Sequence, residues 1–539
     1  MRMLFRTACL CVALAAAPIA PASASADATP PALTSADVDT LFGGLVPFLL
    51  EHFDIAGAQI AVVKDGRPLF EKGYGYSDVA AKRNVDPRTT LFRPGSVSKL
   101  FVWTAVMQLV EQGRIGLDTD VNTYLDFRIP PTWPRPVTMR DLMTHTAGFE
   151  EVSKDLFVEE KAVLPLGAFL RERIPRRLYP PGTIPAYSNY GAALAGYIVQ
   201  RVSGEPLNAY IARHVFAPLG MEYATFDQPV PPRLARLVSK GYVRASQDPV
   251  PYETINMHPA GSAAVSTGDM ARFMIAHLDG GAYGTARILK AETAALMHRT
   301  AHTPVPGLPG MALGFVGEMR NGRTLLAHGG DTVAFHSALH LILNERTGLY
   351  ISFNSAGKDG GSDVARNAIF AAFMDRYFPR LPFAPHKAAG SKTDASLVAG
   401  SYVLSRGSFT NLMAITNLFG REDEVTANPD GSIVTPVLTS IDQTPRVWRP
   451  AGPFLWKLDD GERLYGAKLV DGKVAYLGED DLAPIEVQLP TPLSLAAWNL
   501  PLFFCITAMF ALVVLFWPVK ALLRWRYERP LALTGRARL

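Results

Sequence analysis

Apolar residues recur in the first half of the chain at two different spacings. Between residues 35 and 53 they follow the three-and-four spacing of an amphipathic helix. Apolar runs at 57–63 and 68–76, separated by an Asp-Gly turn, predict a β-hairpin. Helical spacing then dominates the middle of the chain, at 97–112, 141–145, 190–203, 207–216 and 266–278.

Strand-like runs return after this helical middle, at 311–316, 324–328, 335–343 and 349–353. Strands at both ends of a helical segment predict an antiparallel sheet whose first and last strands pair, with helices packed on its faces. We therefore expect a domain of the α/β (α+β) class over residues 35–382.

The composition changes after residue 382, and a chain of 539 residues is too long for one ordinary core. A polar stretch over 383–396 predicts a linker. Beyond it, short strand-like runs alternate with Gly-containing turns, which predicts a small all-β domain at 397–489. Because this domain has no visible reactive group of residues, we interpret it as a spacer or lid.

Two apolar segments lie near the ends of the chain. Residues 1–26 contain Arg2 and Arg6, a short apolar run and a small-residue end, a pattern typical of a secretory signal peptide. Residues 496–517 are apolar over about 33 Å of helix, which is enough for one transmembrane span. The basic residues of 518–539 predict a cytoplasmic tail. The sequence therefore predicts a single-pass protein of the cell membrane with its bulk in the periplasm or extracellular space.

The formal net charge of +4 comes from these two ends. Subtracting +2 for the signal segment and +5 for the residues from Lys520 onward leaves about −3 for the part between them. This balance indicates no nucleic-acid partner. The three cysteines, Cys9, Cys11 and Cys505, all lie in the two apolar segments, so the exported part contains no disulfide.

Candidate chemistry begins at Ser96 and Lys99, at the start of the apolar helix. A spacing of three puts both side chains on one helical face, and the free N–H groups of a helix N-terminus favour an oxyanion. Burial beside a serine lowers the pKa of a lysine towards about 7 to 8, so that Lys99 can take the Ser96 proton. Alone, this pair is weak evidence, because Ser96 can also be an ordinary N-cap.

A second motif, Tyr187-Ser188-Asn189, stands in a polar loop before the next helix. A phenol near a lysine can relay protons to or from a leaving group. The Asn189 amide can bond both the lysine and a substrate carbonyl. The same residues also occur in ordinary turns, so this motif supports a catalytic site only together with the other motifs.

The third motif, His328-Gly329-Gly330, ends a predicted strand. Its two glycines let a substrate backbone lie along the strand edge. The N–H of the following residue, Asp331, can then form an oxyanion hole with the N–H of Ser96.

In this order and spacing, the three motifs resemble those of the class C β-lactamase and penicillin-binding D,D-peptidase superfamily. The segments 138–148, 179–182, 259–262 and 265–267 are similar to supporting segments of that family. The resemblance covers residues 35–382 and implies an α/β sandwich with an all-helical insert and an acyl-enzyme on Ser96. Two departures concern the substrate: His328 stands where many members have lysine, and Ala334 stands where glycine is expected.

We therefore expect a membrane-anchored, exported serine hydrolase that attacks an amide, ester or β-lactam carbonyl. Ser96, Lys99 and Tyr187 are its expected catalytic residues. The expected substrate-binding residues are Asn189, His328, Gly329, Gly330 and Asp331. The substrate is a small molecule or peptide (a D-amino peptide, an ester or a β-lactam), and no metal or organic cofactor is implied.

The alternative is a catalytically silent module that binds or senses cell-wall fragments. The intact Ser96, Lys99 and Tyr187 argue against it. Two other histidines, His336 and His340, lie in a strand-like run without the glutamate of zinc proteases, so we interpret them as packed or solvated residues. We interpret His145 as a brace for a loop near the site.

Overall fold

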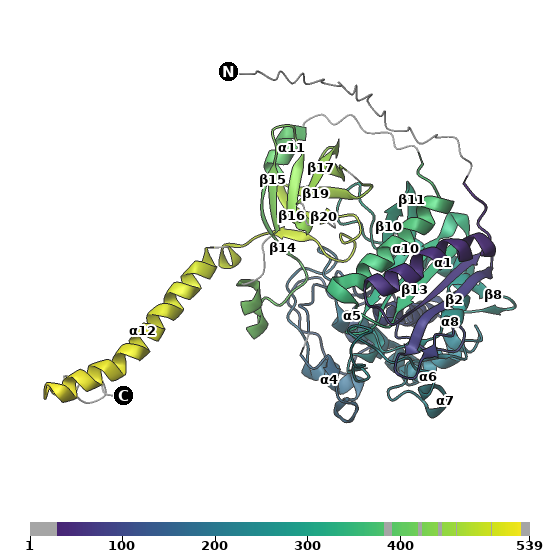
Figure 1. Cartoon of the computed structure of the whole chain (residues 1–539), viewed down its shortest axis with the longest axis horizontal. Coiled ribbons are helices and arrows are strands. Elements are labelled where there is room, and N and C mark those ends of the chain that lie inside the picture. The colour runs from purple at the N-terminus through teal and green to yellow at the C-terminus, as the bar shows by residue number, and fades with distance from the viewer. Residues whose placement is uncertain are drawn as a thin grey trace, which may run out of the picture.

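The computed structural model describes residues 30–152, 154–381, 391–418, 423–439, 445–459, 461–496 and 498–529. It has a larger α/β body, a smaller β-barrel beside it and a long C-terminal helix that leaves both (Figure 1). The predicted signal segment 1–26 and most of the predicted linker 383–396 lie outside the described residues.

The body is built on a seven-stranded antiparallel sheet in the order β10-β11-β12-β13-β1-β2-β3. The strands are β1 (Gly57–Lys64), β2 (Arg67–Asp78), β3 (Arg83–Asn84), β10 (Val316–Arg320), β11 (Arg323–Asp331), β12 (His336–Ile342) and β13 (Thr347–Phe353). In the centre β1 pairs with β13, with Ile60 opposite Ile351. The prediction that the first and last strands pair is therefore confirmed.

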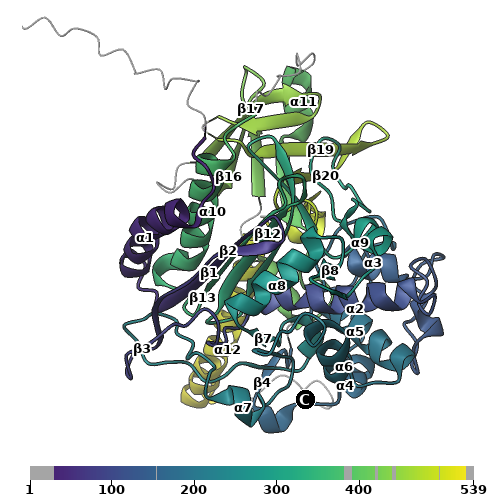
Figure 2. The same ribbon diagram turned by 90° about the vertical axis from the view of Figure 1, so that its right-hand side faces the viewer.

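Helices cover both faces of this sheet, which explains why β1 is a continuous apolar run. On one face lie α1 (Ser35–His52) and α10 (Gly361–Tyr377) (Figure 2). Their Phe42 and Phe373 rings stack on each other. On the other face lies α8 (Thr267–Leu278), in contact with β1 and β13. The larger apolar core lies on this second side and continues into the helical insert.

The helical insert separates the hairpin β1-β2 from the strands β10–β13. Its longest helices are α2 (Lys99–Glu111) and α5 (Asn189–Ser203), which pack against each other. The remaining helices are α3 (Met139–Met143), α4 (Leu166–Glu172), α6 (Leu207–Ile211), α7 (Pro232–Ala235) and α9 (Ala291–His298). Three small two-stranded antiparallel sheets pair β4 (Phe157–Val158) with β6 (Thr254–Ile255), β5 (Ala224–Thr225) with β7 (Ala264–Val265), and β8 (Ala282–Tyr283) with β9 (Ala286–Arg287).

Two predicted boundaries are wrong. The apolar run 311–316 is not a strand, because β10 begins only at Val316 and the preceding residues form a buried irregular segment. In the predicted linker, residues from Ser391 onward are helical: α11 spans Ser391–Val398, and its Ala395 and Val398 are buried in the barrel core. The helix α10 was not predicted.

The C-terminal domain is a closed barrel of β-strands β14 to β21, which agrees with the predicted all-β domain. Its strands are β14 (Gly400–Leu404), β15 (Asp423–Ala427), β16 (Ile433–Thr439), β17 (Pro445–Gly452), β18 (Leu455–Leu458), β19 (Leu464–Val470), β20 (Lys473–Glu479) and β21 (Gln488–Pro490). Closure leaves no sheet edge exposed. Trp448, Trp456 and Tyr465 fill its interior, so the barrel has a packed core.

The last helix, α12 (Asn499–Arg526), extends away from the body (Figure 1). Among the described helices it is the one long and apolar enough to cross a membrane, and its apolar stretch is not buried against the rest of the chain. It runs past the predicted end of the span at residue 517, through Pro518 and into the basic segment.

Candidate active site

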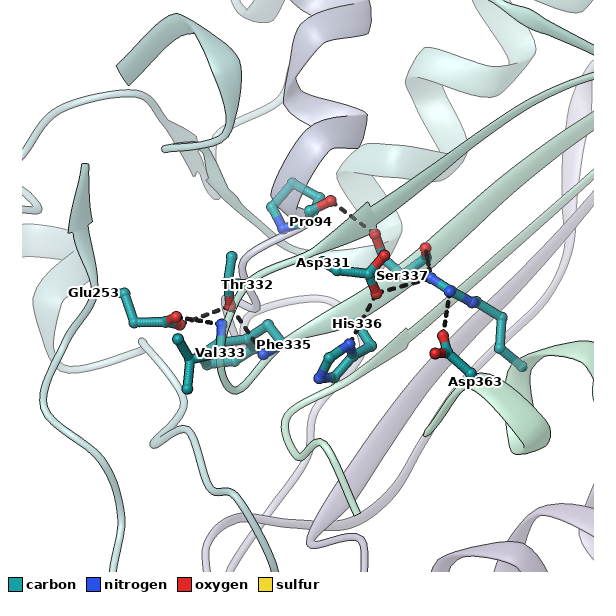
Figure 3. Close-up of polar contacts among 10 residues, drawn as sticks. Pro94, Glu253, Asp331, Thr332, Val333, Phe335, His336, Ser337 and Asp363 are labelled. Carbon is teal, nitrogen blue, oxygen red and sulfur yellow. Dashed lines mark hydrogen bonds and ion pairs between the residues drawn. The ribbon is translucent and has the colours of Figure 1, made fainter. Parts of the chain in front are cut away.

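Ser96 lies in a 3₁₀ turn, Gly95–Ser98, directly before α2. The sequence predicted that it opens an α-helix, whereas the α-helix begins at Lys99. The turn is held from the sheet side, since the Ser337 hydroxyl on β12 donates to the Pro94 carbonyl at 2.7 Å (Figure 3). The nucleophile candidate is therefore fixed by both the helix and the sheet.

Lys99 is fully buried beneath Ser96. Its Nζ lies 3.0 Å from Ser96 Oγ, 2.9 Å from Asn189 Oδ1 and 2.6 Å from the Ala260 carbonyl oxygen. Burial lowers the Lys99 pKa well below 10.5, and the positive charge of Arg406 lowers this pKa further. A neutral amine has two N–H donors and one lone pair. The Asn189 amide oxygen and the Ala260 carbonyl oxygen can accept hydrogen bonds from the two N–H groups. The lone pair is then left to accept the proton of the Ser96 hydroxyl.

Tyr187 lies over this pair. The Lys99 Nζ is 4.8 Å from the centre of the Tyr187 ring. Its hydroxyl is buried beside Ser96, and hydrogen bonding with Ser96 offsets part of the effect of burial on the Tyr187 pKa. Because burial raises the Tyr187 pKa above its usual value, the phenol is neutral at neutral pH and can act as a proton donor.

The close approach of β11 to the Ser96 turn depends on two glycines. A Cβ on Gly330 would clash with the Pro94 carbonyl and lie 2.8 Å from Ser96 N, and a Cβ on Gly95 would lie 2.6 Å from Asp331 N. Gly95 also has a positive φ of 52°, which favours glycine. The backbone nitrogens of Ser96 and Asp331 therefore approach the same space, as an oxyanion hole requires.

The Asp331 side chain points away from that space (Figure 3). Its Oδ1 lies 2.8 Å from His336 Nδ1 and 3.2 Å from Arg366 Nη1. The turn that follows is held by Glu253, which accepts from the Thr332 hydroxyl at 2.6 Å. Asp331 can thus serve the site only through its backbone N–H.

The two strand histidines are packed residues, which confirms their interpretation. His336 is paired with Asp331, as described above. His340 stacks on Phe370 at 3.9 Å between ring centres and pairs with Glu318 at 2.8 Å.

His328 is buried and uncharged. Burial lowers its pKa to about 4. Its Nδ1 lies 2.6 Å from the Gly329 carbonyl oxygen, so the ring proton sits on Nδ1. The other nitrogen, Nε2, is a buried acceptor with no partner among the described residues. His328 therefore does not replace the positive charge of a lysine at this position.

His145 braces the loop that carries Tyr187, as predicted. Its Nδ1 accepts from the Ser188 N–H at 3.3 Å, and its carbonyl accepts from the Ala186 N–H at 2.8 Å. Its ring is 4.3 Å from the Tyr187 ring. The residue has a positive φ of 54°, a strained conformation that these contacts maintain.

One cavity of about 480 Å³ joins most of these groups. The predicted site residues that line it are Ser96, Tyr187, Asn189, His328, Gly329, Gly330 and Asp331. Lys99 lies beneath its floor, in contact with Ser96 and Asn189. Tertiary folding thus brings all the predicted residues together.

The model of the β-lactamase family matches residues 48–373. The chain belongs to the β-lactamase family. Among its curated relatives are a putative penicillin-binding protein, PbpX, of Bacillus subtilis (strain 168), 28% identical over 41% of this chain and 55% of that protein, and a β-lactamase of Yersinia enterocolitica, 29% identical over 46% and 61%. The chain thus spans little more than half the length of these relatives.

Solved structures also resemble this β-lactamase family member. A penicillin-binding protein homologue from Pyrococcus abyssi is 22% identical with a TM-score of 0.54, and the match covers 84% of this chain and all of the other. SurE is 23% identical with a TM-score of 0.57 over 85% and 99% of the two chains. At these identities the likeness concerns the fold alone.

The β-lactamase family match ends before the barrel, yet the barrel reaches the cavity. Arg406 and Ile485 line the cavity together with Ser96. The Tyr187 N–H donates to the Ile485 carbonyl at 2.9 Å, so the barrel also holds the tyrosine loop. Neither residue was predicted from the sequence, which indicated only a spacer or lid for the barrel. No local signal marks Arg406, because its place in the site arises from docking of two domains.

Residues 405–411 of the barrel, here called the strap, are bound by two adjacent glutamates of the β-lactamase domain. Glu150 accepts from the backbone N–H groups of Phe409 and Thr410 at 2.6 and 2.7 Å, and Glu151 pairs with Arg406 at 2.7 Å. Glu150 is only 4% exposed, so these are buried, charge-assisted hydrogen bonds.

Glu150→Ala is expected to loosen the strap. Loss of a buried charge with several hydrogen bonds destabilises the docked barrel by about 3 kcal/mol or more, because the strap N–H groups lose their partner. Chemical denaturation followed by tryptophan fluorescence, with limited proteolysis of the strap, measures this. Glu160→Ala, at an exposed glutamate, is the control. Equal stability and equal proteolysis of the two variants would contradict the expectation.

Proposed function

We propose that this chain is an exported, membrane-anchored serine hydrolase that forms an acyl-enzyme on Ser96. One observation carries the proposal: the Lys99 amine lies 3.0 Å from Ser96 Oγ while two oxygen acceptors occupy its remaining donors. This arrangement supports a neutral lysine that acts as general base.

The reaction follows from the groups around Ser96. The substrate carbonyl oxygen accepts hydrogen bonds from the backbone N–H groups of Ser96 and Asp331. Lys99 accepts the proton of the Ser96 hydroxyl, and Ser96 Oγ forms a bond to the carbonyl carbon. The proton passes through the Tyr187 hydroxyl to the leaving group as the old bond breaks. Water then attacks the ester, activated by the same lysine, and releases the acid.

The substrate class is an amide, ester or β-lactam carbonyl in a small molecule or peptide. The relatives named as a β-lactamase and a putative penicillin-binding protein support this class, and so does a structural neighbour described as a D-alanine carboxypeptidase, AmpC of Burkholderia cenocepacia (19% identical, TM-score 0.51, over 63% of this chain and all of that one). Every step uses groups of the chain and water, so the mechanism calls on no cofactor. The alternative, a silent sensor of cell-wall fragments, gives no reason for the Lys99–Ser96 contact.

The proposed place of action is the outer side of a cell membrane. The apolar helix α12 and the basic residues that follow Trp517 support a single anchor with a cytoplasmic C-terminus. The N-terminal segment 1–26 supports export.

Intact-mass spectrometry of the full chain in detergent tests the proposal. Benzylpenicillin or a fluorophosphonate is expected to add once, and peptide mapping is expected to find the adduct on Ser96. The variant Ser96→Ala is the control and is expected to stay unmodified. An adduct on another residue, or equal labelling of both proteins, would remove Ser96 as the nucleophile.

A further inference from the structure

The cavity has one permanent cation on its wall. Among the described residues that line it, Arg406 is the only arginine or lysine. Its Nε donates to Glu151 Oε2 at 2.7 Å, and among the described residues no acceptor bonds either of its two terminal amino groups. The Arg406 side chain is 37% exposed, so a ligand in the cavity can reach these donors.

Arg406 is held in a fixed place relative to the reacting groups. Its guanidinium lies 4.9 Å from the centre of the Tyr187 ring. Glu151, which anchors it, also has Oε1 3.5 Å from Asn189 Nδ2, and Asn189 Oδ1 contacts Lys99. A guanidinium with two free amino groups matches the geometry of a carboxylate.

The other polar groups of the cavity are unsuited to bind a carboxylate. His328 is neutral and presents a lone pair at Nε2, which repels an anion. Lys99 is buried and committed to Ser96, Asn189 and the Ala260 carbonyl. The Asp331 carboxylate is turned away towards His336.

The rest of the wall beside Arg406 is apolar. Ile485 comes from the barrel, and Leu156, Phe157 and Ile255 come from the β-lactamase domain. Such a wall favours a ligand whose carboxylate stands next to an apolar group.

We propose that Arg406 binds a carboxylate of the substrate, so that the barrel completes the specificity site and selects acyl donors with a free carboxylate beside an apolar group. This inference rests on the proposed acyl-enzyme. It assigns this recognition to a residue of the barrel, because the neutral His328 on β11 presents only a lone pair to the cavity.

The test compares two acyl donors that differ only at this carboxylate, which is free in benzylpenicillin and uncharged in its methyl ester. The measured quantity is the second-order rate constant for Ser96 acylation, from intact-mass time courses of the full chain. The parent is expected to prefer the free acid by about tenfold or more, since a hydrogen-bonded charge pair contributes roughly that much or more to binding. In Arg406→Gln this preference is expected to disappear, while Arg406→Lys keeps part of it.

The ratio of the two rates separates recognition from other effects. A change in Lys99 basicity or in barrel docking lowers both rates equally and leaves the ratio unchanged, so an unchanged ratio in Arg406→Gln overturns the inference. A parent without preference for the acid overturns it as well. Arg449→Gln, at another ion-paired barrel arginine, is the matched control and should keep the parental ratio. If neither donor labels Ser96 in the parent, the proposed function itself fails.

Discussion

Replacing Lys99 with methionine is expected to lower the rate of Ser96 acylation about a thousandfold or more. Lys99 is the only amine in contact with Ser96 among the described residues, and a positioned general base typically contributes 10²- to 10⁴-fold. Methionine matches the length of the lysine stem but accepts no proton. The measurement is the time course of benzylpenicillin or fluorophosphonate labelling by intact mass.

The same variant is expected to fold at least as stably as the parent. A fully buried amine carries a desolvation penalty that an apolar side chain of similar volume does not. Lys64→Met, at a partly buried lysine of β1 that bonds the Glu345 carbonyl, is the control and should keep full labelling. Rapid labelling of Lys99→Met would show that another group takes the Ser96 proton.

The pH dependence of the parent follows from the same group. Only neutral Lys99 accepts the proton, so the acylation rate should rise with pH as this amine loses its proton. Burial lowers the Lys99 pKa well below 10.5, and the plateau is therefore reached at a lower pH than an exposed lysine would allow. His328, with a pKa of about 4, should add no step above pH 5.

Replacing Gly330 with alanine is expected to lower acylation by about a hundredfold to a thousandfold, the effect of losing one oxyanion-hole donor. The added methyl group would meet the Pro94 carbonyl and lie 2.8 Å from Ser96 N, so the strand and the Ser96 turn must move apart. The measurement is the acylation rate, with the unfolding midpoint taken alongside to separate a local shift from general destabilisation.

The neighbouring glycine gives a matched comparison. A Cβ on Gly329 would have as its single near contact Arg366 Nη1 at 3.9 Å, because a side chain added at this position would point to the other face of the strand, although its backbone lines the cavity. Gly329→Ala should therefore lose less than about tenfold, a fraction of the oxyanion-hole effect. Equal losses in the two variants would mean that the Ser96 N–H and Asp331 N–H do not form the oxyanion hole.

Local patterns predicted elements well where burial itself is periodic or continuous. The β1 run, the α5 helix and the pairing of the first and last strands of the sheet agree with the structure. The run at 311–316 misled because a short apolar segment has the same pattern in a strand and in a buried turn. Here Gly314 places that segment against Trp103. The helix α10 was not predicted, because Gly360 precedes it and provides no side-chain cap that would mark the start of a helix in the sequence.

By itself the sequence determined the two-domain division, the antiparallel sheet and the motif residues, because each depends on side-chain patterns within one short segment. It did not determine which further groups join the predicted residues or what their charge states are. The Ala260 carbonyl on Lys99, the neutral state of His328 and the entry of Arg406 into the cavity come from segments far apart in the chain. Such contacts depend on how elements and domains pack, and only the tertiary structure decides burial and neighbouring charge.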